Sequence, residues 1–216
     1  MDSAFRHDLL KAKTLMQAQE YSACLSLCDQ LLSETWKDHA GKYLGEVYEV
    51  KGYVELELFD LQPAITSLQK AIELESKRPK PDTFDIAKTQ QFLGLAYMYA
   101  DEGEKAEQQL LQAYSRYQTI LPTDDINLGY VANSLYLFYD EMFKYEEAGY
   151  YLEEAIRILT IHLPDSHPHL AVLQNNLAAH LIAIGEPHKG QEILQNMVLL
   201  NEAAGRPRLS LENCTT

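Results

Sequence analysis

Apolar side chains recur along this chain with the spacing of amphipathic helices. Five segments carry a small residue, an apolar residue four positions later and another apolar or small residue three positions further on. Side chains at i, i+4 and i+7 lie on one face of a helix, so each segment is predicted to bury one face. The small residues are Cys24, Ala64, Ala106, Ala148 and Gly190. The residues after them are Cys28, Leu68, Leu110, Leu152 and Leu194, followed by Leu31, Ala71, Ala113, Ala155 and Met197.

The five segments are copies of one repeat, because their small residues lie 40, 42, 42 and 42 positions apart. A second set of residues lies twelve positions upstream of the first, and four of its five members are small: Ala12, Gly52, Gly94, Tyr136 and Ala178. Two antiparallel helices approach most closely where both carry small side chains. Each repeat is therefore predicted to be a tight helical hairpin, with these residues in its core.

The repeat divides the chain into an expected set of elements. We predict ten helices, over residues 4–18, 21–35, 39–58, 61–76, 83–100, 103–119, 125–141, 145–161, 168–184 and 187–203. They form five repeats, 4–38, 39–80, 81–122, 123–164 and 165–204, in a single domain over residues 1–204. The linkers before the last three repeats contain proline, which stops a helix, and Asp or Ser, which can cap the next one. Residues 205–216 contain Gly205 and Pro207 and are expected to be a poorly ordered tail.

The repeat resembles the tetratricopeptide repeat (TPR). The clearest copy combines FLGLAY, from Phe92 to Tyr97, with Ala106, Leu110 and Ala113, and SLYLFY with YEEAGYYLEEAI is the next. The 42-residue period and the segment LPDSHPHLAVLQNNLA are similar to repeats of the kinesin light chain type. This resemblance implies an all-α fold, a right-handed α-solenoid of five hairpins. The first repeat departs most from the pattern, since Lys11 stands where the last three copies have Leu93, Leu135 and Leu177, and terminal repeats are often atypical.

Composition excludes several classes of function. The chain has 18 basic and 32 acidic residues, a net charge of −14 that would repel a phosphate backbone, so we expect no nucleic-acid partner. Apolar runs are only a few residues long, so we expect no membrane insertion. The segment MDSAFRHDLLKAK lacks the apolar core of a signal peptide, and three cysteines do not make a disulfide framework. These features predict a cytoplasmic, intracellular protein.

Candidate chemical groups all have a simpler structural explanation. Cys24 and Cys28 share a helix face and could be half of a metal site, but they occupy core positions of the repeat. His162, His167 and His169 cluster around Asp165 and could hold a divalent metal, but they lie in a linker that fixes no ligand geometry. No nucleophile pattern or glycine-rich phosphate loop is recognisable. We therefore expect no catalytic residue, no metal and no cofactor.

In the family that the chain resembles, the first helix of each repeat lines the concave wall of the solenoid. On that pattern, the inward positions of repeats one to three are Arg6, Leu9, Leu10, Lys13, Gln17, Glu46, Glu49, Val50, Tyr53, Glu57, Lys88, Gln91, Phe92, Leu95 and Tyr99. Those of repeats four and five are Tyr130, Asn133, Ser134, Leu137, Glu141, Val172, Asn175, Asn176, Ala179 and Ala183. Some TPR domains bind the C-terminal carboxylate of chaperone tails through Lys, Asn and Arg side chains on three consecutive repeats. Whether the comparison starts on repeat one, two or three, the inward positions of this chain do not carry that set of residues.

Gln91, Asn133 and Asn175 follow one another at 42-residue steps and form a ladder of carboxamides. A carboxamide both donates and accepts hydrogen bonds, which suits the backbone of an extended peptide, and the resemblance implies such contacts for Asn. Tyr99 and Tyr130 would add rigid contact area. The candidate groove residues are Tyr53, Lys88, Gln91, Tyr99, Tyr130, Asn133, Asn175 and Asn176. The alternative is that these polar residues are merely solvated.

The function that these features predict is a non-enzymatic module that binds a peptide or an extended segment of a partner protein in the concave groove. One alternative is a structural scaffold subunit that uses its ends or its convex face. Another is a peptide-sensing regulator that acts through a partner chain. The segment from Ile193 to Leu200 is crowded with apolar residues, so a homo-oligomer through the C-terminal hairpin is a further expectation.

Overall fold

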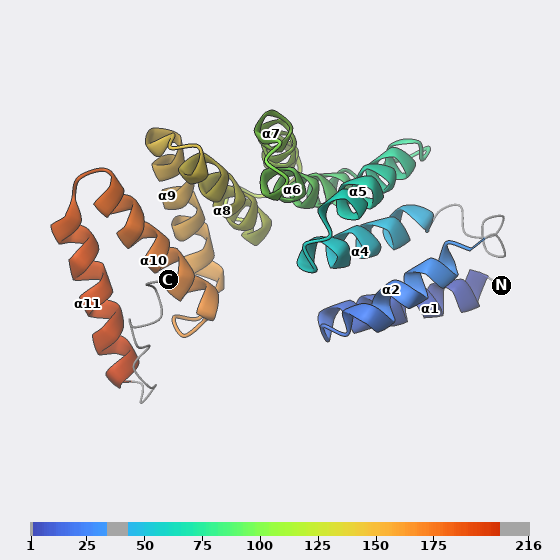
Figure 1. Cartoon of the computed structure of the whole chain (residues 1–216), viewed down its shortest axis with the longest axis horizontal. Coiled ribbons are helices and arrows are strands. Elements are labelled where there is room, and N and C mark those ends of the chain that lie inside the picture. Colours follow the sequence, from blue (N-terminus) through green and yellow to red (C-terminus); the bar gives the residue numbers. More distant parts are fainter. Residues whose placement is uncertain (1, 34–42, 204–216) are drawn as a thin grey trace. The chain divides into compact units, whose positions relative to one another are not determined.

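A computed structural model describes residues 2–33 and 43–203 of the chain. Over these residues the chain is helical and forms five antiparallel helix pairs, with no strand (Figure 1). The first helices of the pairs are α1 (Asp2–Gln17), α4 (Leu44–Glu57), α6 (Thr83–Tyr99), α8 (Ile126–Glu141) and α10 (Pro168–Ala183). The second helices are α2 (Tyr21–Leu31), α5 (Leu61–Ser76), α7 (Gly103–Ile120), α9 (Tyr145–His162) and α11 (Pro187–Ala203). The all-α hairpin prediction is confirmed.

The predicted helix ends are wrong mainly around the first linker. Helix α2 ends at Leu31, not at residue 35, and Leu31 is also its last buried residue. Helix α4 begins at Leu44, whereas the prediction began it at residue 39, and residues 39–42 lie outside the described ranges. Elsewhere the helix bounds differ from the predicted ones by at most two residues.

Side-chain caps begin the first helices of the last three repeats. The carboxylate of Asp82 accepts from the backbone N–H of Phe84 at 2.9 Å, and Asp125 accepts from Asn127 at 2.9 Å. In the fifth repeat the expected Asp or Ser cap is wrong, because Pro168 takes the first helical position and puts His167 at the cap. His167 Nδ1 accepts from the N–H of His169 at 3.2 Å.

Every turn between paired helices contains one residue in the left-handed conformation. These residues are Gln19, Phe59, Asp101 and Phe143, with φ between 57° and 59°, and Gly185, with φ of 89°. Each turn also closes with the two hydrogen bonds of a Schellman motif, such as Phe59 N–H to Leu56 O and Asp60 N–H to Glu55 O, both 2.9 Å. The turn positions repeat with the same period as the core, so one backbone geometry sets the angle of all five hairpins.

The predicted small residues lie where the paired helices approach each other. A Cβ added at Gly52 would lie 2.7 Å from Cγ of Leu68, and one at Gly94 would lie 2.6 Å from Cγ of Leu110. Both distances are shorter than real contacts, so these positions have no room for a side chain. Tyr136 replaces the small residue in the fourth repeat; its ring is buried and its hydroxyl donates to Asn176 O at 3.4 Å.

The predicted core is confirmed in the first four repeats, where all three stripe positions are buried. The cysteines belong to it: Cys24 Sγ donates to Ala12 O at 3.3 Å, and burial raises the pKa of both thiols. The inward placement of Leu194 is wrong, since its side chain is 38% exposed. Helix α11 packs mainly against α10, whereas α9 packs against both α8 and α10, which explains the poorer cover at Leu194.

The contacts divide the chain into two compact units, residues 1–123 and residues 124–216. The division falls beside the predicted boundary between the third and fourth repeats, and one domain over residues 1–204 stays a prediction. The expected tail, residues 205–216, lies outside the described ranges.

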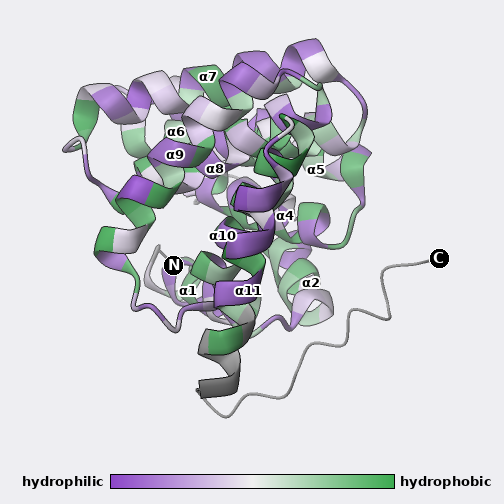
Figure 2. Ribbon diagram, turned by 90° about the vertical axis from the view of Figure 1, so that its left-hand side faces the viewer, coloured by the Kyte–Doolittle hydropathy of each residue, from purple (hydrophilic) through white to green (hydrophobic). Residues whose placement is uncertain are grey.

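Hydrophilic and hydrophobic residues are interspersed along the helices, as the amphipathic pattern requires (Figure 2). In the part of the chain that is described, no helix is long and apolar enough to cross a membrane.

Candidate functional site

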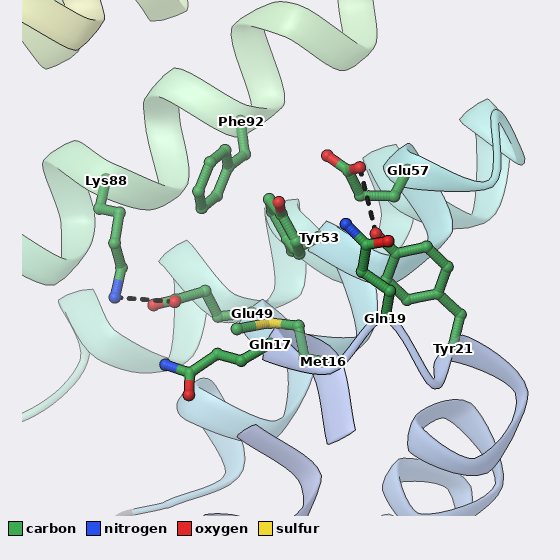
Figure 3. A pocket seen from close by; sticks show the side chains of 9 residues that line it. All are labelled: Met16, Gln17, Gln19, Tyr21, Glu49, Tyr53, Glu57, Lys88 and Phe92. Carbon is green, nitrogen blue, oxygen red and sulfur yellow. Dashed lines mark hydrogen bonds and ion pairs between the residues drawn. The ribbon is translucent and has the colours of Figure 1, made fainter. Parts of the chain in front are cut away.

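The first unit contains a cavity of about 330 Å³ formed mainly by the first helices of its three hairpins (Figure 3). Helices α1, α4 and α6 contribute most of its side chains, the α1–α2 turn contributes Gln19, and α2 contributes its first residue, Tyr21. The complete lining is Met16, Gln17, Gln19, Tyr21, Glu49, Tyr53, Glu57, Lys88 and Phe92. First helices therefore supply an inner surface in this unit, as the repeat pattern predicts.

Six of the nine lining residues occupy predicted inward positions: Gln17, Glu49, Tyr53, Glu57, Lys88 and Phe92. Of the candidate groove residues, the cavity includes Tyr53 and Lys88. Three lining residues were not predicted from the sequence: Met16, Gln19 and Tyr21. Gln19 is the left-handed turn residue, and no glycine at that position signals such a turn. The turn conformation brings Tyr21 of the second helix to the cavity wall, which a pattern of first helices alone does not reveal.

One wall of the cavity carries a cation that is already paired. Lys88 Nζ lies 2.8 Å from Glu49 Oε1 and 3.5 Å from Asp85 Oδ1. Burial raises the pKa of Glu49, although Lys88 opposes this shift. Burial also disfavours the charged form of Lys88, but its ion pairs outweigh that effect and leave its pKa raised. The charge of Lys88 is thus neutralised by Glu49 and Asp85, so it is not available to pair with a ligand.

The rest of the cavity lining is largely aromatic, with Glu57 as its one carboxylate. The rings of Tyr53 and Phe92 pack with centroids 4.9 Å apart, and Tyr21 Oη donates to Glu57 Oε2 at 3.3 Å. Burial, followed by the charge and hydrogen bond of Glu57, raises the pKa of Tyr53 to about 12. Glu57 is exposed and has no cationic partner among the described residues. The hydroxyl of Tyr21 therefore orients a carboxylate that faces solvent.

Two other candidates from the first unit lie outside the cavity lining. Tyr99 is 45% exposed near the end of α6, and its ring packs against Phe59 of the α4–α5 turn with centroids 5.2 Å apart. Gln91 is half-buried on α6. Tyr99 offers an aromatic surface at the end of the hairpins, while a contact of Gln91 with a peptide stays a prediction.

The remaining candidates belong to the second unit, in which α8 and α10 are the first helices. The ring of Tyr130 packs edge-on against His169, with centroids 5.3 Å apart. Asn133 is half-buried and its Oδ1 is enclosed without a hydrogen-bond partner in the described structure; the same holds for Nδ2 of Asn176. Asn175 is exposed. The equivalence of Asn133 and Asn175 in sequence therefore does not extend to equal environments.

The carboxamide ladder divides between the two units, since Gln91 belongs to the first and Asn133 and Asn175 to the second. A continuous ladder over all three residues stays a prediction. Asn133 and Asn176 share another feature, since each has one buried amide atom without a hydrogen-bond partner in the described structure.

The histidine linker has a structural role. His167 caps α10, and His162 Nε2 contacts the backbone carbonyl of Asp124. Burial and the neighbouring His167 lower the pKa of His169. Among the residues described, no group of three or more His, Cys, Asp or Glu side chains is arranged to hold a metal ion.

Comparison with solved structures shows what this arrangement is similar to. A kinesin light chain-like protein of Podosopora anserina with nearly identical TPR-like repeats matches at a TM-score of 0.74 and 18% identity, over 95% of this chain and 98% of that one. BtubC (BKLC) of P. vanneervenii matches at a TM-score of 0.78 and 15% identity, over 100% of this chain and 88% of that one.

A third structure, the apo form of RapI, matches at a TM-score of 0.66 and 14% identity, over 89% of this chain and 54% of RapI. No family model matches the sequence, and no curated protein matches it. At these identities the likeness shows the fold alone, a TPR-type repeat fold.

Proposed function

We propose that this TPR-type fold is a non-enzymatic interaction module that binds a peptide or an extended segment of a partner protein along its first helices. The observation that carries the proposal is the cavity of the first unit, which combines a packed Tyr53–Phe92 pair with polar side chains on both sides. Aromatic surface surrounded by a few oriented polar groups is typical of peptide-binding clefts. A cytoplasmic location and a protein partner are parts of the same proposal.

The second unit supports the proposal through its amides. A buried carbonyl oxygen without a donor, as at Asn133, costs free energy that a ligand N–H can recover once the amide rotates outward. Asn176 offers the complementary unpaired N–H₂ group. An extended peptide presents both donors and acceptors at regular spacing, so it can satisfy both side chains.

An affinity pull-down tests the proposal with the full chain as bait. The wild type is compared with the double variant Asn133→Ala/Asn176→Ala, and partners are identified by mass spectrometry. Each substitution is expected to weaken a groove-bound partner by about 0.5–1.5 kcal/mol with little change in stability. Asn196→Ala, which removes an exposed amide of α11, is the matched control. A partner retained equally by all three proteins would contradict groove binding.

A scaffold role is the second candidate, favoured by exposed aromatic residues in the second unit. Phe143 is 76% exposed and Tyr150 59% exposed. The ring of Tyr150 packs on Tyr151, which in turn stacks on Tyr139 with centroids 5.6 Å apart. Exposed aromatic clusters of this kind mark protein contacts. A partner lost by Phe143→Ala/Tyr150→Ala but kept by the double amide variant would favour the scaffold. A partner chain whose activity changes when a peptide binds to this protein would favour the peptide-sensing regulator.

A further inference from the structure

We infer that the cavity of the first unit recognises a basic side chain, with an arginine guanidinium of a bound peptide as its ligand. The inference rests on the proposed peptide-binding function and names the chemistry of the partner. The lining holds one cation, Lys88, and two carboxylates, Glu49 and Glu57, and Lys88 is already engaged by Glu49 and Asp85. Glu57 is therefore the charge that a ligand meets.

Glu57 is presented in a way that suits a planar cation. Its carboxylate accepts a hydrogen bond from the hydroxyl of Tyr21 at 3.3 Å, which holds it beside the Tyr21 ring. In Figure 3, Glu57 and Tyr21 lie on one side of the Tyr53–Phe92 pair, and Lys88 and Glu49 lie on the other. A guanidinium can stack on an aromatic face while it donates to a carboxylate, and an ammonium ion matches this combination less well.

The surroundings reinforce the preference for a cation. The exposed side chains of Glu20, Asp60 and Asp101 follow the ends of the three helices that line the cavity. None of these helices has a basic residue in its last turn. The whole chain carries a net charge of −14, so a basic peptide is attracted over a distance and an acidic one is repelled.

The cavity also has the volume for one long side chain. Its volume of about 330 Å³ exceeds that of a single residue, and Met16 and Gln17 line it together with the rings. The methylene groups of an arginine can pack on Met16 and Phe92 while the charged end reaches Glu57. An apolar ligand would leave Glu57 unused, and an acidic ligand would place two carboxylates side by side.

The test uses nuclear magnetic resonance with the methionine methyl groups labelled with ¹³C. Met16 lines the cavity, while Met98 and Met142 do not and serve as internal controls. The probes are N-acetyl-arginine amide, its neutral analogue N-acetyl-citrulline amide, and N-acetyl-lysine amide. The Met16 signal, assigned with Met16→Leu, is expected to shift with the arginine probe and to require about tenfold more of the citrulline probe.

Glu57→Gln is expected to weaken the arginine probe by about tenfold, while Glu104→Gln, which removes an exposed carboxylate of α7 outside the cavity, leaves its affinity unchanged. Equal binding of the arginine and citrulline probes, or a stationary Met16 signal, would overturn the inference. A lysine probe that binds as tightly as the arginine probe would overturn the preference for a guanidinium.

The pull-down separates the two failures. A partner lost by the double amide variant, together with a Met16 signal indifferent to arginine, would leave the peptide-binding function standing and reject the basic ligand. A cavity that binds the arginine probe, in a protein whose partners all ignore both the amide substitutions and Glu57→Gln, would reject the peptide-binding function on the first helices and leave only the recognition of the cation.

Discussion

Leu110 fills the space that a side chain at Gly94 would occupy. A Cβ at Gly94 would lie 2.6 Å from Cγ and 2.8 Å from Cδ2 of Leu110, and 3.2 Å from its backbone nitrogen. Leu110 is fully buried, so it cannot swing away. Gly52 and Leu68 make the same contact one repeat earlier. Close approach of α6 and α7 at this contact explains why the repeat has a small residue at this position.

Gly94→Ala is therefore expected to destabilise the protein. Overpacking a tight core costs about 1–3 kcal/mol, and the better helix propensity of alanine returns about 1 kcal/mol or less. The free energy of unfolding, measured with urea, is expected to fall.

Gly45→Ala is the matched control, because a Cβ at Gly45 in α4 would meet its nearest neighbours at an ordinary 3.6–3.7 Å. That variant is expected to be as stable as the wild type or up to about 1 kcal/mol more stable. Equal effects of the two substitutions would contradict the packing described for Gly94.

Gly185→Ala is expected to destabilise the last hairpin through the backbone alone. Gly185 has a φ of 89°, and an added Cβ would meet no atom within 4 Å. The cost therefore reports conformational strain, about 1 kcal/mol or more. Thermal unfolding measures it.

Phe143→Gly is the reciprocal variant, because Phe143 holds a φ of 57° at the equivalent turn with an exposed ring. Glycine relieves the backbone strain there, but it also raises the conformational entropy of the unfolded chain. The free energy of unfolding is therefore expected to stay level or rise by up to about 1 kcal/mol. A clear loss of stability in this variant would show that the turn does not strain its side chain.

The sequence predicts the hairpins and their core well, because burial of one helix face imposes a period that the residues must follow. The stripe from Ala64 to Leu68 and Ala71 is an example, since every member is buried. The left-handed turns could not be predicted from the sequence, because four of the five turn residues are Gln, Phe or Asp instead of glycine. The backbone accepts this strain where packing of the helices fixes the turn.

The candidate site is predictable only in part for the same reason. First-helix residues such as Tyr53 and Lys88 follow from the period. Tyr21 reaches the cavity because the turn at Gln19 directs it there. Asn133 and Asn175 are identical in the repeat but differ in burial, since burial depends on the neighbouring repeat, which the period does not encode.

Tyr136 is expected to make the protein sensitive to alkali. Burial, followed by the charge of Asp140, raises its pKa from 10.0 to about 12. The folded state thus favours the protonated phenol, so this contribution to stability is complete below pH 10 and is lost as the pH rises towards 12. Tyr136→Phe is expected to make the alkaline loss of stability shallower, as followed by circular dichroism.

At neutral pH, Tyr136→Phe removes the hydrogen bond to Asn176 O and is expected to cost about 0.5–1.5 kcal/mol. Tyr150→Phe, at an exposed phenol of the same unit, is the control and is expected to change neither the neutral stability nor the alkaline slope. If the stability of Tyr136→Phe falls with alkaline pH just as that of the wild type does, groups other than Tyr136 cause the alkaline loss of stability.

The last hairpin is expected to associate with a second copy of the chain. Leu199 on α11 is 62% exposed, and Ile182, Ile184 and Leu194 are exposed as well, so the hairpin carries apolar surface without cover in the described structure. Light scattering at micromolar concentration is expected to show a dimer that Leu199→Asp dissociates. Ile161→Asp, at a 61% exposed position of α9, is the matched control and is expected to leave the dimer intact. A wild-type monomer, with amide exchange over residues 187–203 as slow as in the central repeats, would show instead that this surface is covered within one chain.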